Sequence, residues 1–298
     1  PKEPSKIIYP SGKLIVVRDV EDPNDCFIYR GHSFPTTVAK FSPNGYWVAS
    51  ADTSGKVRVW SWDNPEHILK LESPALGGSV LDLDWDSESK RIAVSGESGG
   101  IMVKCLTWDT GNSVGEMVGH TKRVNSVAYK PTRPFRIMTC SEDFRSICYA
   151  GPPFKLDHSN SGAHTNFANC VRYSPDGTKA VSVGSDKKIQ FYDGSGNPTT
   201  DISTNTHAGT ISSVSWNPES TKILTVSADK TAKVWNVDSK ECEVTFSFSS
   251  DPQVGDMQCS ALWTKTHMIT VSLNGNSNIL STDEPTAPRV IQANQVAL

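Results

Sequence analysis

Short segments that alternate apolar and polar residues recur along the whole chain, separated by turns rich in Pro, Asn, Asp and Gly. Segments such as TVAKFS, NCVRYS and ISSVSW have a period of two, which is typical of strands that bury one face. Turns such as SPNG at Ser42, SPDG at Ser174 and NPES at Asn217 connect them. Pro fixes φ and Gly tolerates positive φ, so these turns suit hairpins. The pattern therefore predicts an all-β chain.

The hairpins repeat as a larger unit, and its third strand is the easiest to recognise because it often ends in an aromatic residue, as in AKVWN. The corresponding positions are predicted at Arg18, Trp60, Trp108, Tyr149, Tyr192, Trp235 and Leu280. Their spacings are 42, 48, 41, 43, 43 and 45 residues. A period of about 40–45 residues with four strands per unit is typical of β-propeller blades. We predict seven blades, with an insertion around residues 97–101 in the longest interval.

These units resemble WD repeats, a family in which a histidine, a Ser or Thr, an aspartate and a tryptophan form a hydrogen-bonded chain across each blade. His207, Ser227 (or Thr225), Asp229 and Trp235 supply the complete set. Other copies are incomplete: tyrosine replaces tryptophan in two units, the seventh has Asn274 and Leu280, and the second has Ser54 at the aspartate position. We therefore expect a seven-bladed WD-repeat β-propeller over residues 1–298, with a structural role for these polar groups.

Composition narrows the function. The 298 residues carry a net charge of -3 and no basic cluster larger than Lys187-Lys188, which argues against nucleic-acid binding. Apolar runs are too short to cross a bilayer, so we expect no membrane association. The chain starts at Pro1 without a recognisable leader, and we expect it to be a fragment. Seven cysteines scattered without CxxC spacing favour reduced thiols in a cytoplasmic protein and predict no zinc site.

Motifs of catalysis and cofactor binding are missing. GxSxG, HExxH, P-loop and dinucleotide-binding patterns do not appear in a strand–helix context, where their chemistry would require them. Four of the seven histidines fall at the same place in the repeat, which a structural role explains, and a Ser, a His and an Asp close together are expected in every blade. We therefore expect no enzyme, no cofactor and no metal.

Residues that the repeat does not explain are better candidates for binding. TRPFR at residues 132–136 and AGPPFKLD at residues 150–157 each combine proline, an aromatic residue and a cation. Proline cannot donate to a sheet ladder, so the second segment is predicted at a blade margin or loop. Phe154 and Lys155 are then either an exposed interface anchor or a buried ring beside a solvated lysine. Glu97 and Glu142 lie in turns where the repeat imposes no acidic residue.

Several of these departures together resemble one family. KFSPNGYWVASADTSGKVRVW, WDTGNSVGEMVGH, KPTRPFRI, GPPFK and VRYSPDG are similar to the N-terminal propeller of actin-interacting protein one, a WD-repeat partner of cofilin. The resemblance runs from about Ile7 to the end of the chain.

This resemblance implies a non-enzymatic cytoplasmic protein of the actin cytoskeleton, built in full from two tandem seven-bladed propellers. Such proteins bind cofilin-decorated actin filaments, promote their disassembly and limit regrowth at barbed ends. Carried over by motif, the contact surface contains Glu97, Glu142, Lys155, Leu156 and Phe167, and we add Phe154 from its place beside Lys155. We expect a monomer.

Two further hypotheses remain. The rival function is a general WD-repeat scaffold, for instance a substrate receptor of a ligase, which would bind its partner on the opposite face or at the channel mouth. The second hypothesis concerns the ends: the chain opens on what reads as a second strand, so Gln295 to Leu298 are expected to complete that blade and remove two sheet edges.

Overall fold

Each segment that alternates apolar and polar residues forms a strand, and successive strands pair as antiparallel hairpins. The computed structural model describes residues 5–204, 206–286 and 288–291. Its strands fall into two units, Pro1–Ser161 and Gly162–Leu298. In the described part of the chain, no helix is long and apolar enough to span a bilayer.

The described residues of the unit Pro1–Ser161 form four sheets, which we call blades 1 to 4. Blade 1 contains β1 (Lys6–Ser11), β2 (Leu14–Asp19) and β3 (Cys26–Tyr29). Blade 2 contains β4 (Thr36–Phe41), β5 (Trp47–Asp52), β6 (Lys56–Ser61) and β7 (Leu69–Pro74). Blade 3 contains β8 (Val80–Trp85), β9 (Arg91–Gly96), β10 (Val103–Thr107) and β11 (Ser113–Glu116). Blade 4 contains β12 (Val124–Tyr129), β13 (Arg136–Ser141), β14 (Ser146–Ala150) and β15 (Lys155–Asn160).

The described residues of the unit Gly162–Leu298 form three sheets, blades 5 to 7. Blade 5 contains β16 (Ala168–Tyr173), β17 (Lys179–Gly184), β18 (Ile189–Asp193) and β19 (Pro198–Ile202). Blade 6 contains β20 (Ile211–Trp216), β21 (Lys222–Ser227), β22 (Thr231–Asn236) and β23 (Cys242–Ser247). A short 3-10 helix, η1 (Val254–Asp256), precedes blade 7, which contains β24 (Gln258–Trp263), β25 (Met268–Ser272), β26 (Ser277–Leu280) and β27 (Arg289–Ile291).

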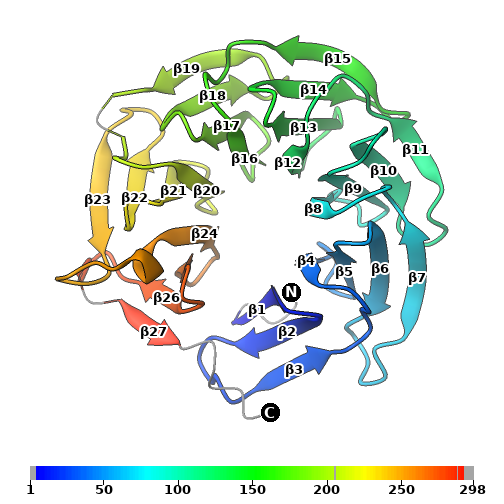
Figure 1. Ribbon diagram of the computed structural model, residues 1–298, viewed down its shortest axis with the longest axis horizontal. Helices are drawn as coiled ribbons and strands as arrows, with labels where there is room; N and C mark the ends of the chain where they lie inside the picture. Colours follow the sequence, from blue (N-terminus) through cyan, green and yellow to red (C-terminus); the bar gives the residue numbers. More distant parts are fainter. Residues whose placement is uncertain (1–4, 205, 287, 292–298) are drawn as a thin grey trace. The chain divides into compact units, whose positions relative to one another are not determined.

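Every sheet is a meander in which strands pair in chain order. Within the unit Pro1–Ser161 the blades follow one another so that β4 lies against β8 and β8 against β12, while β7, β11 and β15 lie at the opposite edges of their sheets (Figure 1). The seven sheets of the described residues confirm the predicted all-β, seven-bladed β-propeller. The predicted closing strand Gln295 to Leu298 lies outside the described residues.

Within each unit, the hydrophobic core lies between successive sheets. One cluster joins blades 2 and 3 through residues such as Val57, Leu83 and Ile92, and another joins blades 5 and 6 through residues such as Val181 and Ile211. The second strand of a blade is therefore buried on both faces, as in β9 and β21, where every residue after the first is buried. Each such Val, Leu or Ile contributes roughly 1.5–3 kcal/mol by leaving water.

The register of the strands corrects one predicted landmark. Trp60, Tyr149 and Trp235 each pair with the second residue of the preceding strand. In blade 3 the residue in that position is Leu106, opposite Ile92, and not Trp108, which follows β10. The prediction was wrong because it aligned residue type instead of register. The spacings on either side become 46 and 43 residues.

The predicted insertion in blade 3 is present. The connection between β9 and β10 spans residues 97–102, whereas the equivalent connection in blade 6 spans residues 228–230. The displaced Trp108 packs instead against Trp47 of blade 2, with ring centroids 4.7 Å apart.

Candidate functional site

A hydrogen-bonded chain of four side chains crosses blade 6. His207 Nδ1 lies 2.9 Å from Asp229 Oδ2, and its Nε2 lies 2.9 Å from Thr225 Oγ1. Trp235 Nε1 donates to the same Thr225 oxygen at 2.8 Å. Since indole N–H only donates and an aspartate only accepts, the series is complete when Thr225 O–H donates to Nε2 and Nδ1–H donates to Asp229. A neutral imidazole satisfies every member.

The hydroxyl in this chain is Thr225, the alternative to the predicted Ser227. Ser227 is the last residue of β21, and its Oγ accepts a hydrogen bond from the backbone N–H of Asp229 at 3.0 Å. Residues two apart on a strand point to the same face, so spacing alone leaves both hydroxyls possible. In the structure, Ser227 therefore belongs to the turn, and Thr225 belongs to the hydrogen-bonded chain of four side chains, which we call the tetrad.

Blade 2 contains the same hydrogen-bonded chain, but its aspartate comes from a different position in the repeat. His32 Nδ1 lies 2.7 Å from Asp52 Oδ2, its Nε2 lies 2.8 Å from Ser50 Oγ, and Trp60 Nε1 donates to Ser50 at 3.2 Å. Ser54 occupies the position that Asp229 has in blade 6, as predicted, but blade 2 does not lack the acid. Asp52, at the end of β5, supplies the carboxylate, and Ser54 Oγ donates to it at 2.5 Å. The offset from the tryptophan missed this acid because it sits two residues earlier in the chain.

Blades 4 and 5 complete the set with tyrosine in place of tryptophan. The histidine–aspartate distances are 2.8 Å for His120–Asp143 and 3.0 Å for His164–Asp186. In blade 5 the chain continues from His164 through the Ser182 hydroxyl to the Tyr192 hydroxyl, 2.8 Å away. The same histidine position thus carries the same bond in four blades.

The electrostatics of these aspartates follow from two opposing causes. Burial by itself raises the pKa of Asp229, but hydrogen bonds from His207 and Thr231 outweigh it and hold the pKa well below its ordinary value. The pKa values of Asp143 and Asp186 are lowered in the same way by their histidines. Such ionised carboxylates anchor the turns between second and third strands.

These groups do not form a hydrolytic site. The hydroxyl oxygen of Thr225 is shared between His207 and Trp235, and the residue is completely buried. A nucleophile must reach a substrate, and this oxygen lies inside the blade. The arrangement stabilises the fold.

The predicted binding residues differ in their exposure to solvent, and Phe154 is the buried one. It is 1% exposed and packs edge-on against Tyr129, with ring centroids 5.5 Å apart. Its loop connects β14 and β15, as predicted from Pro152 and Pro153, and the Phe154 N–H bonds the Val114 carbonyl at 2.9 Å. Phe154 is therefore not an exposed anchor, because the hydrophobic core between blades 3 and 4 takes its ring.

The other predicted residues reach the surface at different places. Lys155 and Leu156 begin β15 and are exposed, Leu156 by 47%. Glu97 is exposed in the connection between β9 and β10. Glu142 lies in the corresponding connection of blade 4, half-buried and paired with Arg123 Nε at 2.7 Å. Phe167, in the unit Gly162–Leu298, is 37% exposed just before β16.

The register separates two of these positions within blade 4. Lys155 pairs with Ala150 at one end of β14, whereas Glu142 lies in the turn at the other end. The five residues of β14 place these ends about 13 Å apart. Glu97 and Glu142 follow equivalent strands, β9 and β13, and so occupy the same end of neighbouring blades.

One residue that sequence reasoning missed stands beside Glu142. Phe144 is 37% exposed in the same turn, and Lys122 Nζ lies 5.6 Å from its ring centre. The signal in the sequence was an aromatic residue in a turn that the repeat fills with polar residues. Phe144, Lys122, Arg123 and Glu142 together make one end of blade 4 a mixed aromatic and charged surface, which we call the blade 4 turn surface.

Comparison with known proteins agrees with the repeat structure. The family model described as WD domain, G-beta repeat matches residues 24–61, 111–145, 157–193 and 199–236. All four matches contain both the histidine and its aspartate partner; three of them end with a third strand, and the match 111–145 ends just before β14. Blade topology and matched repeats together define the class: the chain is a WD-repeat β-propeller.

Similar proteins indicate a narrower group than the WD-repeat class as a whole. The chain is 47% identical over 288 residues to Actin-interacting protein 1-2 of Arabidopsis thaliana, covering 93% of this chain and 46% of that protein. It is 42% identical over 297 residues to WD repeat-containing protein 1-B of Xenopus laevis, covering 99% of this chain and 48% of that protein. WD repeat-containing protein 1 of Gallus gallus is 40% identical over the same length. These findings confirm the resemblance to the actin-interacting protein 1 family, and the chain spans about half the length of the relatives it matches.

Proposed function

We propose that this chain is a non-enzymatic, actin-regulatory WD-repeat propeller. It binds actin filaments decorated with cofilin, promotes their disassembly and limits regrowth at barbed ends. The observation that carries the proposal is identity of 40–47% over nearly the whole chain to proteins named actin-interacting protein 1 or WD repeat-containing protein 1. We further propose that the chain is the first of two tandem propellers, and that it acts as a cytoplasmic monomer on the actin cytoskeleton.

Exposed residues of blade 4 support a protein-binding surface. The blade 4 turn surface offers an aromatic ring flanked by both signs of charge, and Lys155 and Leu156 add an exposed cation and an apolar side chain on β15. Aromatic residues and cations at the centre of an interface often supply most of its binding energy. A propeller face is large enough for an interface of about 800 Å² per partner.

The proposed mechanism is differential affinity. A protein shifts a filament toward its cofilin-bound conformation only if it binds that conformation more tightly than bare actin. The surface residues therefore act by contacting groups that cofilin binding brings into reach. No covalent chemistry is needed, which agrees with a buried and fully satisfied His–Thr–Asp arrangement in the blade interior.

The first test is co-sedimentation with actin filaments, with and without cofilin, combined with imaging of filament disassembly. Lys155→Ala and Phe167→Ala should each weaken binding to cofilin-decorated filaments about tenfold, the loss of about 1.4 kcal/mol that a moderate interface contact represents. Lys265→Ala and Leu262→Ala are matched controls, since both residues are exposed in blade 7.

The outcomes separate the alternatives. Wild-type behaviour of Lys155→Ala and Phe167→Ala would contradict the proposed contact residues. A wild-type chain that sediments with neither bare nor cofilin-decorated filaments would contradict the actin role, and would favour a general WD-repeat scaffold with another partner.

A further inference from the structure

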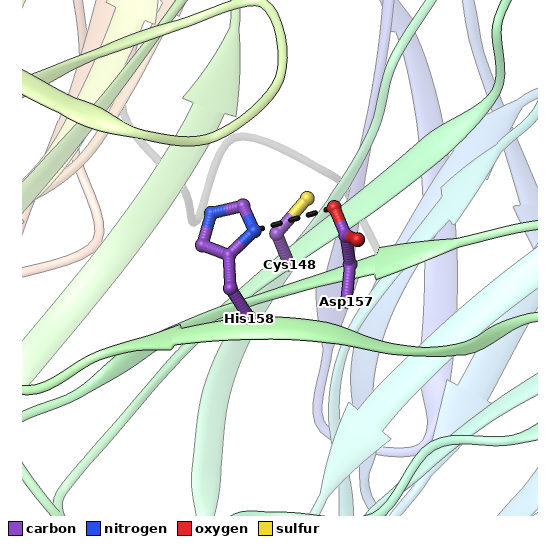
Figure 2. Close-up of side chains that lie close together, drawn as sticks. All are labelled: Cys148, Asp157 and His158. Carbon is purple, nitrogen blue, oxygen red and sulfur yellow. Dashed lines mark hydrogen bonds and ion pairs between the residues drawn. The ribbon is translucent and has the colours of Figure 1, made fainter.

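Three potential metal ligands converge at the outer edge of blade 4. Cys148 on β14 and Asp157 and His158 on β15 place a sulfur, a carboxylate oxygen and an imidazole nitrogen within 4.8 Å of one another. Figure 2 shows the three side chains pointing toward one another, with the sulfur beside the line that joins the imidazole to the carboxylate. The sulfur is buried, whereas Asp157 is exposed and His158 half-buried, so the cluster opens to solvent on one side.

A β-bulge makes this convergence possible. Successive residues of a regular strand point to opposite faces, so Asp157 and His158 would normally diverge. In blade 4, Cys148 pairs with His158 and Tyr149 pairs with Leu156, which leaves Asp157 as an extra residue between them. A bulge of this kind re-aims the side chains around it. Both neighbours can therefore face Cys148.

Other blades provide an internal control for this feature. The same bulge occurs in blade 2, where the three equivalent residues are Val59, Lys70 and Leu71. It occurs again in blade 6, where they are Val234, Glu243 and Val244. The bulge is thus common to these blades and needs no ligand. The combination of thiol, carboxylate and imidazole distinguishes blade 4 from both.

We propose that Cys148, Asp157 and His158 bind a zinc ion. Thiolate, imidazole and carboxylate are the donors that zinc takes in proteins, and a soft sulfur disfavours Mg²⁺ and Ca²⁺. His158 Nδ1 and Asp157 Oδ2 are 3.3 Å apart, close to the separation of about 3.4 Å between two ligands on a tetrahedral zinc ion with bonds of about 2.0–2.1 Å. Three protein ligands leave the fourth position to water on the exposed side.

Arg136 has two effects at this site. Its Nη1 lies 2.6 Å from Asp157 Oδ2, so it holds the carboxylate in place as outer partners of metal ligands commonly do. Its positive charge also opposes a cation nearby, which makes the site weaker than a closed four-ligand site. Asp157 and His158 lie nine and ten residues after Cys148, on the paired strand, and the search for ligands at short spacing therefore predicted no zinc site.

This inference does not depend on the actin role. Zinc at this position would tie β15 to β14 directly beside Lys155 and Leu156, and it would stabilise the edge of the sheet whatever partner binds there. Binding should also release the thiol proton of Cys148, because the thiolate is the ligand.

The test uses the chain carrying Cys242→Ser and Cys259→Ser, which removes its two exposed thiols. After treatment with a chelator and dialysis, calorimetric titration with Zn²⁺ should show that a single equivalent binds. In a separate thermal denaturation, Zn²⁺ should raise the midpoint of unfolding. Co²⁺ in place of Zn²⁺ should give a thiolate-to-cobalt charge-transfer band. His158→Ala should weaken binding by more than the roughly 10–100-fold that loss of an outer-shell partner costs.

Further variants make the result decisive. Asp157→Ala should weaken binding as well, and Cys148→Ser should abolish the cobalt charge-transfer band. His267→Ala in blade 7 is the matched control and should bind like the parent. Absence of zinc binding by the parent overturns the proposal, and so does binding that is unchanged in His158→Ala. Because His158 is half-buried at a sheet edge, its variant is expected to fold, which circular dichroism checks directly.

Discussion

In blade 6 the buried polar groups between the second and third strands are connected by His207, whose ring bonds Asp229 and Thr225. In blade 7 amide side chains bond the hydroxyl of Ser272, the last residue of β25. Gln258 Nε2 donates to Ser272 Oγ at 2.8 Å, and Asn278 Nδ2 donates to the same oxygen at 2.8 Å. Gln258 and Asn278 are both almost completely buried. A blade therefore requires partners for its buried polar groups, and an ionisable pair is only one way to supply them.

The difference lies in what each network contains. Blade 6 keeps an ionised carboxylate whose pKa is lowered by its hydrogen bonds, so its stability is linked to pH. The blade 7 network of Gln258, Ser272 and Asn278 has no titratable member. Breaking the first network should take one donor from a half-buried charge, which then keeps only Thr231 and backbone N–H groups, whereas breaking the second leaves neutral groups that can rotate toward other partners.

The largest effect is expected for His207→Ala. It removes the donor to Asp229 and the acceptor of the Thr225 hydroxyl at once, inside a buried blade. We expect the free energy of unfolding to fall by about 3 kcal/mol, the upper end for leaving buried polar groups unpaired. Urea denaturation followed by tryptophan fluorescence measures it. A loss below about 1 kcal/mol would mean that the tetrad does not stabilise the blade as the geometry implies.

A smaller effect is expected for Asn278→Ala in blade 7. The lost amide leaves the hydroxyls of Ser272 and Thr270 without one donor, but no charge is left unpaired. We expect a loss of about 1–2 kcal/mol by the same denaturation assay. A loss equal to or greater than that of His207→Ala would contradict the distinction between the ionised and the neutral network.

The smallest expected effect is on how the free energy of unfolding depends on pH through Asp229, and it is also the most specific. The folded pKa of Asp229 lies below its unfolded value, so its contribution to stability is complete above an unfolded pKa of about 3.9 and is lost as pH falls below that value. Asp229→Asn should therefore show a shallower decline of unfolding free energy over that acid range than the wild-type chain. Asn278→Ala should keep the wild-type slope, and a changed slope there would indicate a different origin.

The sequence predicts the fold well because a period repeated seven times averages out local errors. Strand alternation, turn residues and the interval of about 43 residues all describe the same unit, so a misplaced landmark in blade 3 leaves the number of blades unchanged. Details that depend on register were less accessible. Leu106 takes the place expected for Trp108, because only pairing between strands decides which neighbour faces inward, and Asp52 supplies the carboxylate of blade 2 from a position that the repeat offset did not indicate.

The candidate sites show the same limit. Ser227 and Thr225 share a face of one strand, and only the position of the His207 ring distinguishes them. Phe154 follows two prolines in a loop, which suggests exposure, yet the hydrophobic space between blades 3 and 4 accepts its ring. The cluster of Cys148, Asp157 and His158 arises from a bulge between paired strands. Contacts of this kind depend on three-dimensional pairing and leave no trace in linear spacing.

Burial of the second strand on both faces limits how the chain can be dissected. An excised sheet would expose to water two apolar flanks that in the intact unit are covered by different neighbours. The smallest fragment with a fully enclosed strand is thus a run of three adjacent sheets, and its outer members would each need a substitute cover. We therefore expect this chain to fold and unfold in groups of adjacent sheets. A substitution that destabilises one sheet should first destabilise the sheets that pack against it.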